Sequence, residues 1–396
     1  MPTLTHPTAQ ELLTDIRRIA PELVDIRREI HAHPELAFEE VQTSNLVAAK
    51  LAEWGYQVER GIGGTGLVGQ LRRGNGVQRL GLRADMDALP IVERTGLPYS
   101  STVHGKMHAC GHDGHTAILL CAAKYLAEHG RFNGTLNLIF QPAEENEGGA
   151  LRMVDEGLFD RYPCDSIYAL HNAPGLPVGH MAMSAGAAMA SFDRITVELT
   201  GVSAHGAMPH HGVDPMQCAA SIVLGLQSLV SREIDAQRAA VITVGSVQCG
   251  EVYNIVPERA VLKIGVRTLE PKVREQIERR IKAFVQAQAE SYGLGCSIEY
   301  VHKYPVLVNP ADHTEFARQV AIDLLGADKV SERQPTMGSE DFAYMLQAVP
   351  GAYVRLGNGV GEDGGCMVHN PGYDFNDDAL PTGAAFWVRL VHARLL

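Results

Sequence analysis

The feature that most constrains the fold of this chain is a change of rhythm in its middle. In the first part, helical patterns alternate with short apolar segments, which indicates an α/β layer fold. The segments that predict strands there are 67–71, 79–83, 135–140 and 166–170. Between residues 192 and 301 the expected order becomes strand, helix, strand, strand, helix, strand. This β-α-β-β-α-β order is typical of a ferredoxin-like unit.

Beyond that block the first pattern returns, with a helical stretch at 314–325 and an apolar strand at 352–356. We therefore expect one discontinuous α/β domain, made of residues 1–187 and 303–396, and an inserted domain of residues 188–302. A chain of 396 residues is long enough for two such domains, each with a core of its own.

Two local signals sharpen this picture. Asp113 precedes a helical pattern that continues to Gly130, so we expect its side chain to cap that helix. Residues 61–66 read GIGGTG, which matches the letters of a dinucleotide-binding fingerprint. That fingerprint must open a helix, whereas an apolar strand follows it in this chain. A hairpin turn is the better interpretation.

Composition and charge argue against several classes of protein. Lysine and arginine number 34 against 46 aspartates and glutamates, a net charge of −12, and no basic run could neutralise nucleic-acid phosphates. No apolar stretch approaches the ~18 residues of a membrane span, and no signal peptide is evident. Seven cysteines, an odd number without a CxxC pair, argue against a disulfide framework. We expect a cytoplasmic protein that binds neither nucleic acid nor membrane.

The sharpest local signal is the segment MHACGHDGHTA, residues 107–117. Cysteine and histidine are preferred ligands of transition metals, and a glycine-bent loop can aim Cys110 and His112 at one point. A thiol near a helix N-terminus also ionises more easily, which suits ligation. The alternative is a redox-sensitive or merely buried cysteine beside surface histidines, and this segment alone does not decide between them.

Polar and ionisable residues also follow several of the expected strands. They are Asp85, Asp87, Glu144, Glu145 and His171. Sites in open α/β sheets form beyond the carboxyl ends of strands, so these side chains could converge. His369 adds a histidine in an irregular loop near the C-terminus. A lone histidine or an acidic pair is usually structural or solvated, so it is their joint occurrence that favours a site.

The adjacent acids Glu144 and Glu145 can divide two tasks. Neighbouring side chains on an extended segment point in opposite directions, so one carboxylate can bind a metal while the other faces the substrate. A carboxylate beside a metal site can accept a proton from the attacking water and later pass it to a leaving amine. Cys110 as a nucleophile with a histidine base is conceivable, but it leaves both glutamates without a role.

Eight ordered motifs resemble those of a known family. They are RADMDALP (83–90), MHACGHDGHTA (107–117), QPAEE (141–145), ALHN (169–172), SAHGAMPHHGVDP (203–215), NIVPE (254–258), GSEDF (338–342) and HNPGYDFND (369–377). The set resembles the aminoacylase and carboxypeptidase family of dinuclear metallohydrolases, and most closely its branch of hippurate hydrolases and auxin-conjugate hydrolases. The resemblance implies a metal-dependent exopeptidase-like catalytic domain with an inserted dimerisation or lid domain.

The resemblance also implies a metal site. Two divalent ions would be held by Cys110, His112, Glu145, His171 and His369, with the Cys110 thiolate as the bridging ligand. The ligand types suit Zn²⁺ or Mn²⁺, and Co²⁺ or Ni²⁺ are compatible with them. Two divalent ions outweigh the negative charges of Cys110, Glu145 and one hydroxide, so the site would remain positive and favour a substrate that bears a carboxylate.

Other residues take catalytic and substrate-binding roles by the same resemblance. Glu144 would be the general base and acid, and His205 of the inserted domain would reach across a dimer to polarise the substrate carbonyl. Asn254 and Arg267 match positions that hold the free carboxylate of the substrate. Asp87 would support the ligands, whereas the role of Asp85 is left open.

The activity that the resemblance implies is hydrolysis of the amide bond of an N-acyl amino acid, which releases a carboxylic acid and a free amino acid. One alternative is a dipeptidase or carboxypeptidase of the same family. Another is a metal-dependent binding protein without activity, which the intact Glu144 disfavours. We expect a homodimer or a higher homo-oligomer, because pairing two edge strands of the inserted domain would leave neither edge bare.

Overall fold

The computed structural model describes residues 6–145 and 147–396. The chain forms two compact units, of which the first consists of Met1–Gly186, Val308–Gln334 and Tyr344–Leu396. The second consists of Ala187–Leu307 and Pro335–Ala343. The segment Pro335–Ala343 thus joins the second unit, although the sequence analysis placed it in the discontinuous domain. Hydrogen bonds from the Ala190 amide to the carbonyls of Thr336 (3.1 Å) and Gly338 (2.8 Å) tie it there.

The first unit is built on an eight-stranded sheet in the order β1-β2-β4-β3-β5-β16-β6-β15. The strands are β1 Gln57–Ile62, β2 Gly66–Arg73, β3 Arg79–Asp85, β4 Gly134–Gln141, β5 Ser166–Pro174, β6 Met181–Ala182, β15 Val330–Ser331 and β16 Gly351–Gly359. The central strands β4, β3, β5 and β16 run parallel and are buried along nearly their whole length, as strands covered on both faces must be. The strands expected at these positions are confirmed.

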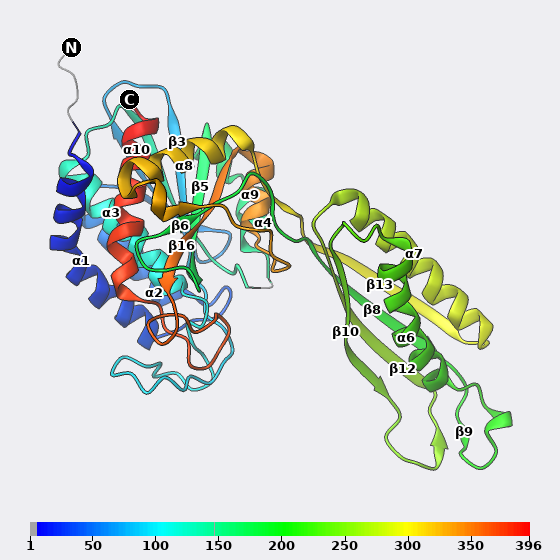
Figure 1. Cartoon of the computed structure of the whole chain (residues 1–396). Helices are drawn as coiled ribbons and strands as arrows, with labels where there is room; N and C mark the ends of the chain where they lie inside the picture. The colour runs from blue at the N-terminus through cyan, green and yellow to red at the C-terminus, as the bar shows by residue number, and fades with distance from the viewer. Residues whose placement is uncertain (1–5, 146) are drawn as a thin grey trace. The chain divides into compact units, whose positions relative to one another are not determined.

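The helices of this unit are α1 Ala9–Ala32, α2 Val41–Glu53, α3 His112–His129, α4 Gly149–Asp155, α5 Leu158–Arg161, α8 Ala311–Leu325, α9 Phe342–Ala348 and α10 Leu380–Arg394, with 3-10 turns η2 Ala327–Lys329 and η3 Asp377–Ala379. Helices α3 and α10 pack side by side against the sheet, and α1 packs against both of them (Figure 1). Helix α3 is buried along most of its length, which fixes the direction in which its first turn faces. The antiparallel pairing of β1 with β2 confirms that residues 61–66 form a hairpin turn.

The start of α3 differs from the sequence prediction. Its N-cap is Gly111, in a left-handed conformation with φ 92°, and Asp113 lies within the first turn. A Cβ atom on residue 111 would lie 2.5 Å from Tyr373 Oη and 2.7 Å from Asn172 Oδ1, so glycine is required at this close approach. The prediction that Asp113 caps the helix was wrong, because its buried carboxylate bonds instead to His31 and Arg27.

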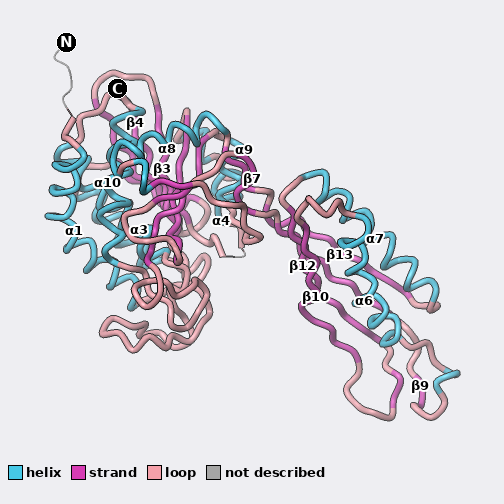
Figure 2. The backbone as a smooth tube through the Cα atoms, viewed as in Figure 1, coloured by secondary structure: helices cyan, strands magenta, loops and turns pink. Residues whose placement is uncertain are grey.

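The second unit has the order expected of a ferredoxin-like domain. Its elements are β8 Phe192–Thr200, α6 Pro215–Glu233, β10 Ala240–Cys249, β12 Arg259–Thr268, α7 Pro271–Ser291 and β13 Gly295–Tyr304. The strands form an antiparallel sheet in the order β10-β12-β8-β13, and α6 and α7 cover one of its faces (Figures 1 and 2). The apolar residues of α7 that face this sheet recur at helical spacing, as in Ile277, Ile281 and Val285.

Short elements complete the described chain. They are β7 Gly186–Met189, β9 Ala204–His205, η1 Pro209–His211, β11 Ile255–Val256 and β14 Leu307–Asn309. In the part of the chain that the structure describes, no helix has both the length and the hydropathy needed to cross a bilayer. All seven cysteines are free thiols. The expected cytoplasmic location stays a prediction.

Candidate metal centre

The candidate site lies beyond the carboxyl ends of the central strands of the first unit. Two loops meet there, 86–111 between β3 and α3 and 360–376 after β16 (Figure 1). The amide of His369 donates to the carbonyl of Ala109 (2.7 Å), and the amide of Arg94 donates to that of Pro371 (2.8 Å). These bonds hold the histidine of the second loop beside the start of α3.

Five expected ligands come together as two groups that share one sulfur. Ligand atoms of Cys110, His112 and His171 all lie within 4.8 Å of one another, and so do those of Cys110, Glu145 and His369. Cys110 Sγ lies 3.4 Å from His171 Nε2, and His369 Nε2 lies 3.0 Å from Glu145 Oε1. A thiolate between a two-histidine group and a histidine–carboxylate group is a donor set that suits two borderline divalent ions.

The orientation of His112 favours metal ligation. Its Nδ1 lies 3.1 Å from Asp87 Oδ1, so Asp87 takes up this nitrogen and Nε2 is the one left to face a cation. Nε2 is buried and has no hydrogen-bond partner among the described residues. A buried ring nitrogen without a hydrogen bond, in the candidate ligand set, fits a bound cation.

Asp87 acts on two ligands at once. One oxygen faces His112, and the other accepts a hydrogen bond from the backbone amide of Glu145 (2.9 Å). Asp85, two residues earlier, is fully buried and forms an ion pair with the guanidinium of Arg83 (2.7 Å), which compensates its charge. Asp87 therefore contacts two of the expected ligands, whereas Asp85 is part of a buried ion pair.

A second row of residues lies behind the ligands, and the sequence analysis did not predict this supporting role for any of them. His115 Nδ1 lies 2.6 Å from Asp85 Oδ1, and His115 Nε2 lies 2.8 Å from Asn172 Oδ1. The side-chain Nδ2 of Asn172 donates to Tyr373 Oη (2.6 Å). The signal was present, because residues three apart on a helix share a face, which places His115 directly behind His112. Asn172 stands next to His171 in the ALHN motif.

Burial controls the protonation of the soft ligands. Burial and the neighbouring Glu145 raise the pKa of the Cys110 thiol, so the expectation that a helix N-terminus would favour its ionisation was wrong for the protein alone. A bound cation is then what would hold the thiolate. Burial, reinforced by His115 and Arg355, lowers the pKa of His171 well below its usual value. His171 is thus kept neutral, the form that binds metal.

Glu144 lies beside this donor set rather than within the shared-sulfur groups. Its carboxylate oxygen is within 4.8 Å of the ligand atoms of His112 and Glu145, and the side chain is only 6% exposed. It follows Ala143, whose φ of 54° is unusual for a residue with a side chain. A buried carboxylate at this distance from a metal can exchange a proton with a water held there.

A buried guanidinium ties together the elements that carry the ligands. Arg27 of α1 is fully buried and donates to Asp113 of α3 (3.2 Å), Asp374 (2.8 Å) and Asp377 (2.9 Å). The first acid stands next to His112 and the second follows His369 by five residues. Loss of one of these three carboxylates would leave an uncompensated charge in the interior, so removal of any of them is expected to be destabilising.

Two expected residues of the second unit lie together at one of its ends. His205 in β9 pairs with Ile255 in β11, and the amide of Gly206 donates to the carbonyl of Asn254 (2.8 Å). His205 and Asn254 are both exposed. Exposed apolar side chains surround them, with Tyr253 fully exposed and Val252 about half exposed.

The third expected residue of the second unit lies elsewhere. Arg267 stands near the end of β12, whose first residue, Arg259, is eight positions away, about 26 Å along a strand. Its Nη1 donates to the carbonyl of Met337 (2.9 Å) and to Ser339 Oγ (3.2 Å), and its guanidinium lies 4.6 Å from the ring centroid of Phe192. Within one chain, the structure does not bring Arg267 together with His205.

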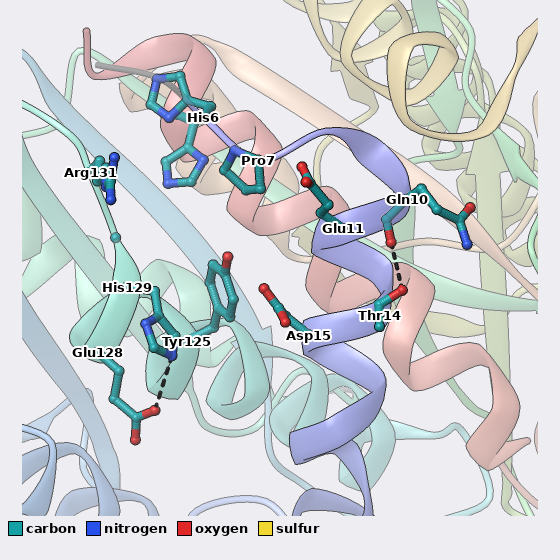
Figure 3. Close-up of a pocket in the computed structure, with 12 residues that line it drawn as sticks. His6, Pro7, Gln10, Glu11, Thr14, Asp15, Tyr125, Glu128, His129 and Arg131 are labelled. Carbon is teal, nitrogen blue, oxygen red and sulfur yellow. Dashed lines mark hydrogen bonds and ion pairs between the residues drawn. The ribbon is translucent and has the colours of Figure 1, made fainter. Parts of the chain in front are cut away.

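A separate hollow lies at the far end of α3 from the metal ligands (Figure 3). His6, Asp15, Tyr125 and His129 line it, and none of the candidate site residues does. The rings of His6 and His392 stack there with centroids 4.3 Å apart. Nothing in its chemistry connects it to the donor set described above.

Comparisons with known proteins agree with this geometry. Residues 81–393 match the peptidase family M20/M25/M40. The chain is 41% identical over 380 residues to the hippurate hydrolase of Campylobacter jejuni, covering 96% of this chain and 98% of that protein. It is 39% identical over 368 residues to the IAA-amino acid hydrolase ILR1-like 2 of Arabidopsis thaliana, covering 92% of this chain and 83% of that protein.

The solved structures include a close match in fold. A dinuclear metal-binding peptidase of the M20 family from Bacillus subtilis superimposes with a TM-score of 0.81 at 30% identity, covering 95% of this chain and 98% of that one. The family, the two-part fold and the hydrolase class that the sequence predicts are thereby confirmed. This chain is a hydrolase that belongs to the peptidase family M20/M25/M40.

Proposed function

We propose that this chain hydrolyses the amide bond of N-acyl amino acids with two divalent metal ions, releasing a carboxylic acid and a free amino acid. The observation that carries the proposal is the pair of ligand groups that share Cys110, with Glu144 buried beside them. The names of the hippurate and IAA-amino acid hydrolases among its relatives supply the substrate class.

The proposed ligands are Cys110, His112, Glu145, His171 and His369. Zn²⁺ or Mn²⁺ suits this mixture of thiolate, imidazole and carboxylate, and Co²⁺ or Ni²⁺ is compatible with it. When bound, two such ions supply Lewis acidity to the amide carbonyl and to the attacking water. Asp87 holds the proton on Nδ1 of His112, so that Nε2 faces the cation.

The proton transfers belong to Glu144. Its carboxylate accepts a proton from the attacking water and returns one to the nitrogen of the leaving amino acid, so that the C–N bond breaks without releasing an amide anion. The low exposure of Glu144 keeps bulk water from exchanging that proton. Glu145 cannot share this task while its carboxylate serves as a ligand.

Residues of the second unit complete the proposed site. His205 donates a hydrogen bond to the oxygen that becomes negative, and Asn254 and Arg267 bind the free carboxylate of the substrate. The separation of Arg267 from His205 within one chain supports a homodimer in which His205 serves the metal centre of the partner. Edge strands β10 and β13 offer the unpaired backbone groups through which two copies can associate.

The name of the matched family favours a second candidate, a dipeptidase or carboxypeptidase. Metal-stripped protein, with and without added Mn²⁺ or Zn²⁺, should be offered benzoyl- and acetyl-amino acids and free dipeptides, and amino-acid release measured. Metal-dependent cleavage of the acylated substrates alone supports the amidohydrolase. Cleavage of dipeptides with a free α-amino group would instead support the peptidase, and tight binding without turnover would contradict both.

A further inference from the structure

The general base of the proposed reaction follows a residue in an unfavourable backbone conformation. Ala143 has a φ of 54°, in the left-handed region where a Cβ atom collides with the backbone. Rotation about the N–Cα bond of residue 143 moves the chain that follows it. The backbone conformation of residue 143 therefore determines where the carboxylate of Glu144 points. Such a conformation persists only where surrounding groups hold it.

Two hydrogen bonds to its backbone hold Ala143. Its amide donates to Glu40 Oε1 (2.8 Å), and its carbonyl accepts from the amide of Gly149 (2.9 Å). Glu40 is fully buried, at the residue that precedes α2. Glu40 therefore satisfies a buried backbone donor one position before the base, from a segment about a hundred residues away in sequence.

The glycine-rich turn 61–66 helps to hold Glu40 in place. Thr65 Oγ1 donates to the second oxygen of Glu40, so the turn fixes the carboxylate that fixes Ala143. A Cβ atom on Gly66 would lie 2.8 Å from Pro142 Cδ, and one on Gly149 would lie 1.8 Å from the Pro142 carbonyl oxygen. Glycine at both positions lets the backbone of the hairpin and of α4 close around the segment that leads to the base.

We propose that Glu40 is a positioning residue for the general base: anchored by Thr65, it holds Ala143 in the left-handed conformation and thereby aims Glu144 at the metal centre. The inference rests on the proposed function, because it takes Glu144 as the base. Burial raises the pKa of Glu40 to about 7, and both the neutral and the charged carboxyl can accept the amide bond of Ala143.

A substitution that removes the strain provides the test. Glu40→Ala is expected to lower kcat roughly 5- to 30-fold, with KM and metal content unchanged. This factor is the expected fall in the population of the left-handed conformation of Ala143 when Glu40 no longer holds it. Ala143→Gly alone should stay close to wild type, because glycine adopts this conformation freely. The double variant Glu40→Ala/Ala143→Gly should then recover most of the lost kcat. Glu40→Gln, which keeps an acceptor, should lose little.

Controls separate positioning from general destabilisation. Glu35 is a buried carboxylate that accepts the amides of Gln42 and Thr43 (2.9 Å each) without touching the base segment. Glu35→Ala should lower the melting temperature while kcat is kept. Hydrogen–deuterium exchange of the peptide 140–150 should rise in Glu40→Ala and not in Glu35→Ala, which reports on the segment independently of activity.

The outcomes decide two questions separately. Wild-type kcat in Glu40→Ala, or a double variant as slow as Glu40→Ala, would overturn the positioning role. Activity retained in Glu144→Gln would instead overturn the base assignment, whatever Glu40 does. Should Glu40→Ala fail to fold, Thr65→Val removes the anchoring hydrogen bond alone and should give a smaller fall in kcat that Ala143→Gly reverses. A wild-type kcat in Thr65→Val, or a fall in kcat that Ala143→Gly does not reverse, would equally contradict the proposal.

Discussion

The metal centre and the exposed end of the second unit carry functional residues in opposite ways. At the metal centre His112 is backed by Asp87 and His171 by the carbonyl of Asn172, and Cys110, His112 and His171 are buried, whereas Glu145 is partly buried and His369 is exposed. His205 instead stands exposed on the short strand β9, and Asn254 is exposed in the turn before β11. The first region is preorganised within one chain. In the proposed function, the second would acquire a defined environment when a substrate or a second copy covers it.

This difference predicts where substitutions act. A substitution in the metal centre should alter metal affinity or the chemical step of the same chain, because the side chains that contact the substituted residue are already in place. A change at the exposed end should leave the metal alone and alter turnover only where that end meets a substrate. The following experiments can break or sharpen that distinction.

The largest effect is expected from Glu144→Gln, which keeps the shape of the side chain but cannot accept the proton. We expect turnover to fall by ~10⁴-fold, the upper range for a general base, with metal content near that of the wild type. Turnover and metal content should be measured on the same preparation. Glu147→Gln is the matched control, since Glu147 is an exposed glutamate of the same segment. Substantial activity in Glu144→Gln would contradict its role.

His205→Ala should lower kcat about 10²- to 10³-fold, as the loss of one donor to a developing oxyanion does, and should leave metal binding unchanged. His129→Ala, at an exposed histidine of the first unit, is the control. The sharper experiment mixes inactive Glu144→Gln and His205→Ala subunits. If His205 serves the partner, half the dimers are mixed and each has one intact site, so about a quarter of wild-type activity should return. No recovery would place His205 in its own chain's site.

Asp87→Asn should act on metal affinity rather than on chemistry. An asparagine would turn its amide group toward either His112 or the backbone amide of Glu145, and one of the two contacts would become donor against donor. We expect 10- to 100-fold weaker metal binding, typical of such supporting groups, with kcat largely restored at saturating metal. Competition with a chelator measures it. Asp165→Asn, at an exposed pair with Arg79, should change nothing.

The same comparison shows what sequence alone could predict. Strand ends and the Cys110–His112 loop are local patterns, so their convergence followed from the α/β order. Arg267 and His205 were named only through the resemblance, and His369 was assigned as a ligand only through it, because irregular loops and short strands have no regular spacing from which a role could be predicted. Contacts between distant segments were missed altogether, such as Arg27 with Asp377, 350 residues apart. The wrong prediction for Asp113 has the same origin. Its carboxylate bonds to Arg27 and His31, which are distant in sequence, whereas the capping rule considers only neighbouring residues.

The smallest predicted effect concerns the stability of the network behind the metal centre. His31 is fully buried, and although burial opposes its protonation, bonds to Asp113 (2.8 Å) and Glu93 (3.3 Å) raise its pKa to about 9. The folded pKa lies above the unfolded value of about 6.5, so this contribution is fully present below pH 6.5 and is lost as the pH rises through 9. The shift corresponds to about 2–3 kcal/mol after allowance for relaxation.

Urea unfolding of the wild type should therefore show stability that declines from pH 6.5 to 9, and His31→Gln should be less stable at low pH with a flatter profile. His33→Gln, next along the same helix end but exposed, should retain the wild-type slope. Metal-free protein must be used for all three, because metal binding has a pH dependence of its own. An equal slope in His31→Gln and the wild type would mean that the buried network is not held by a charged histidine. The rigidity of the metal centre would then depend on Arg27 and its three carboxylates alone.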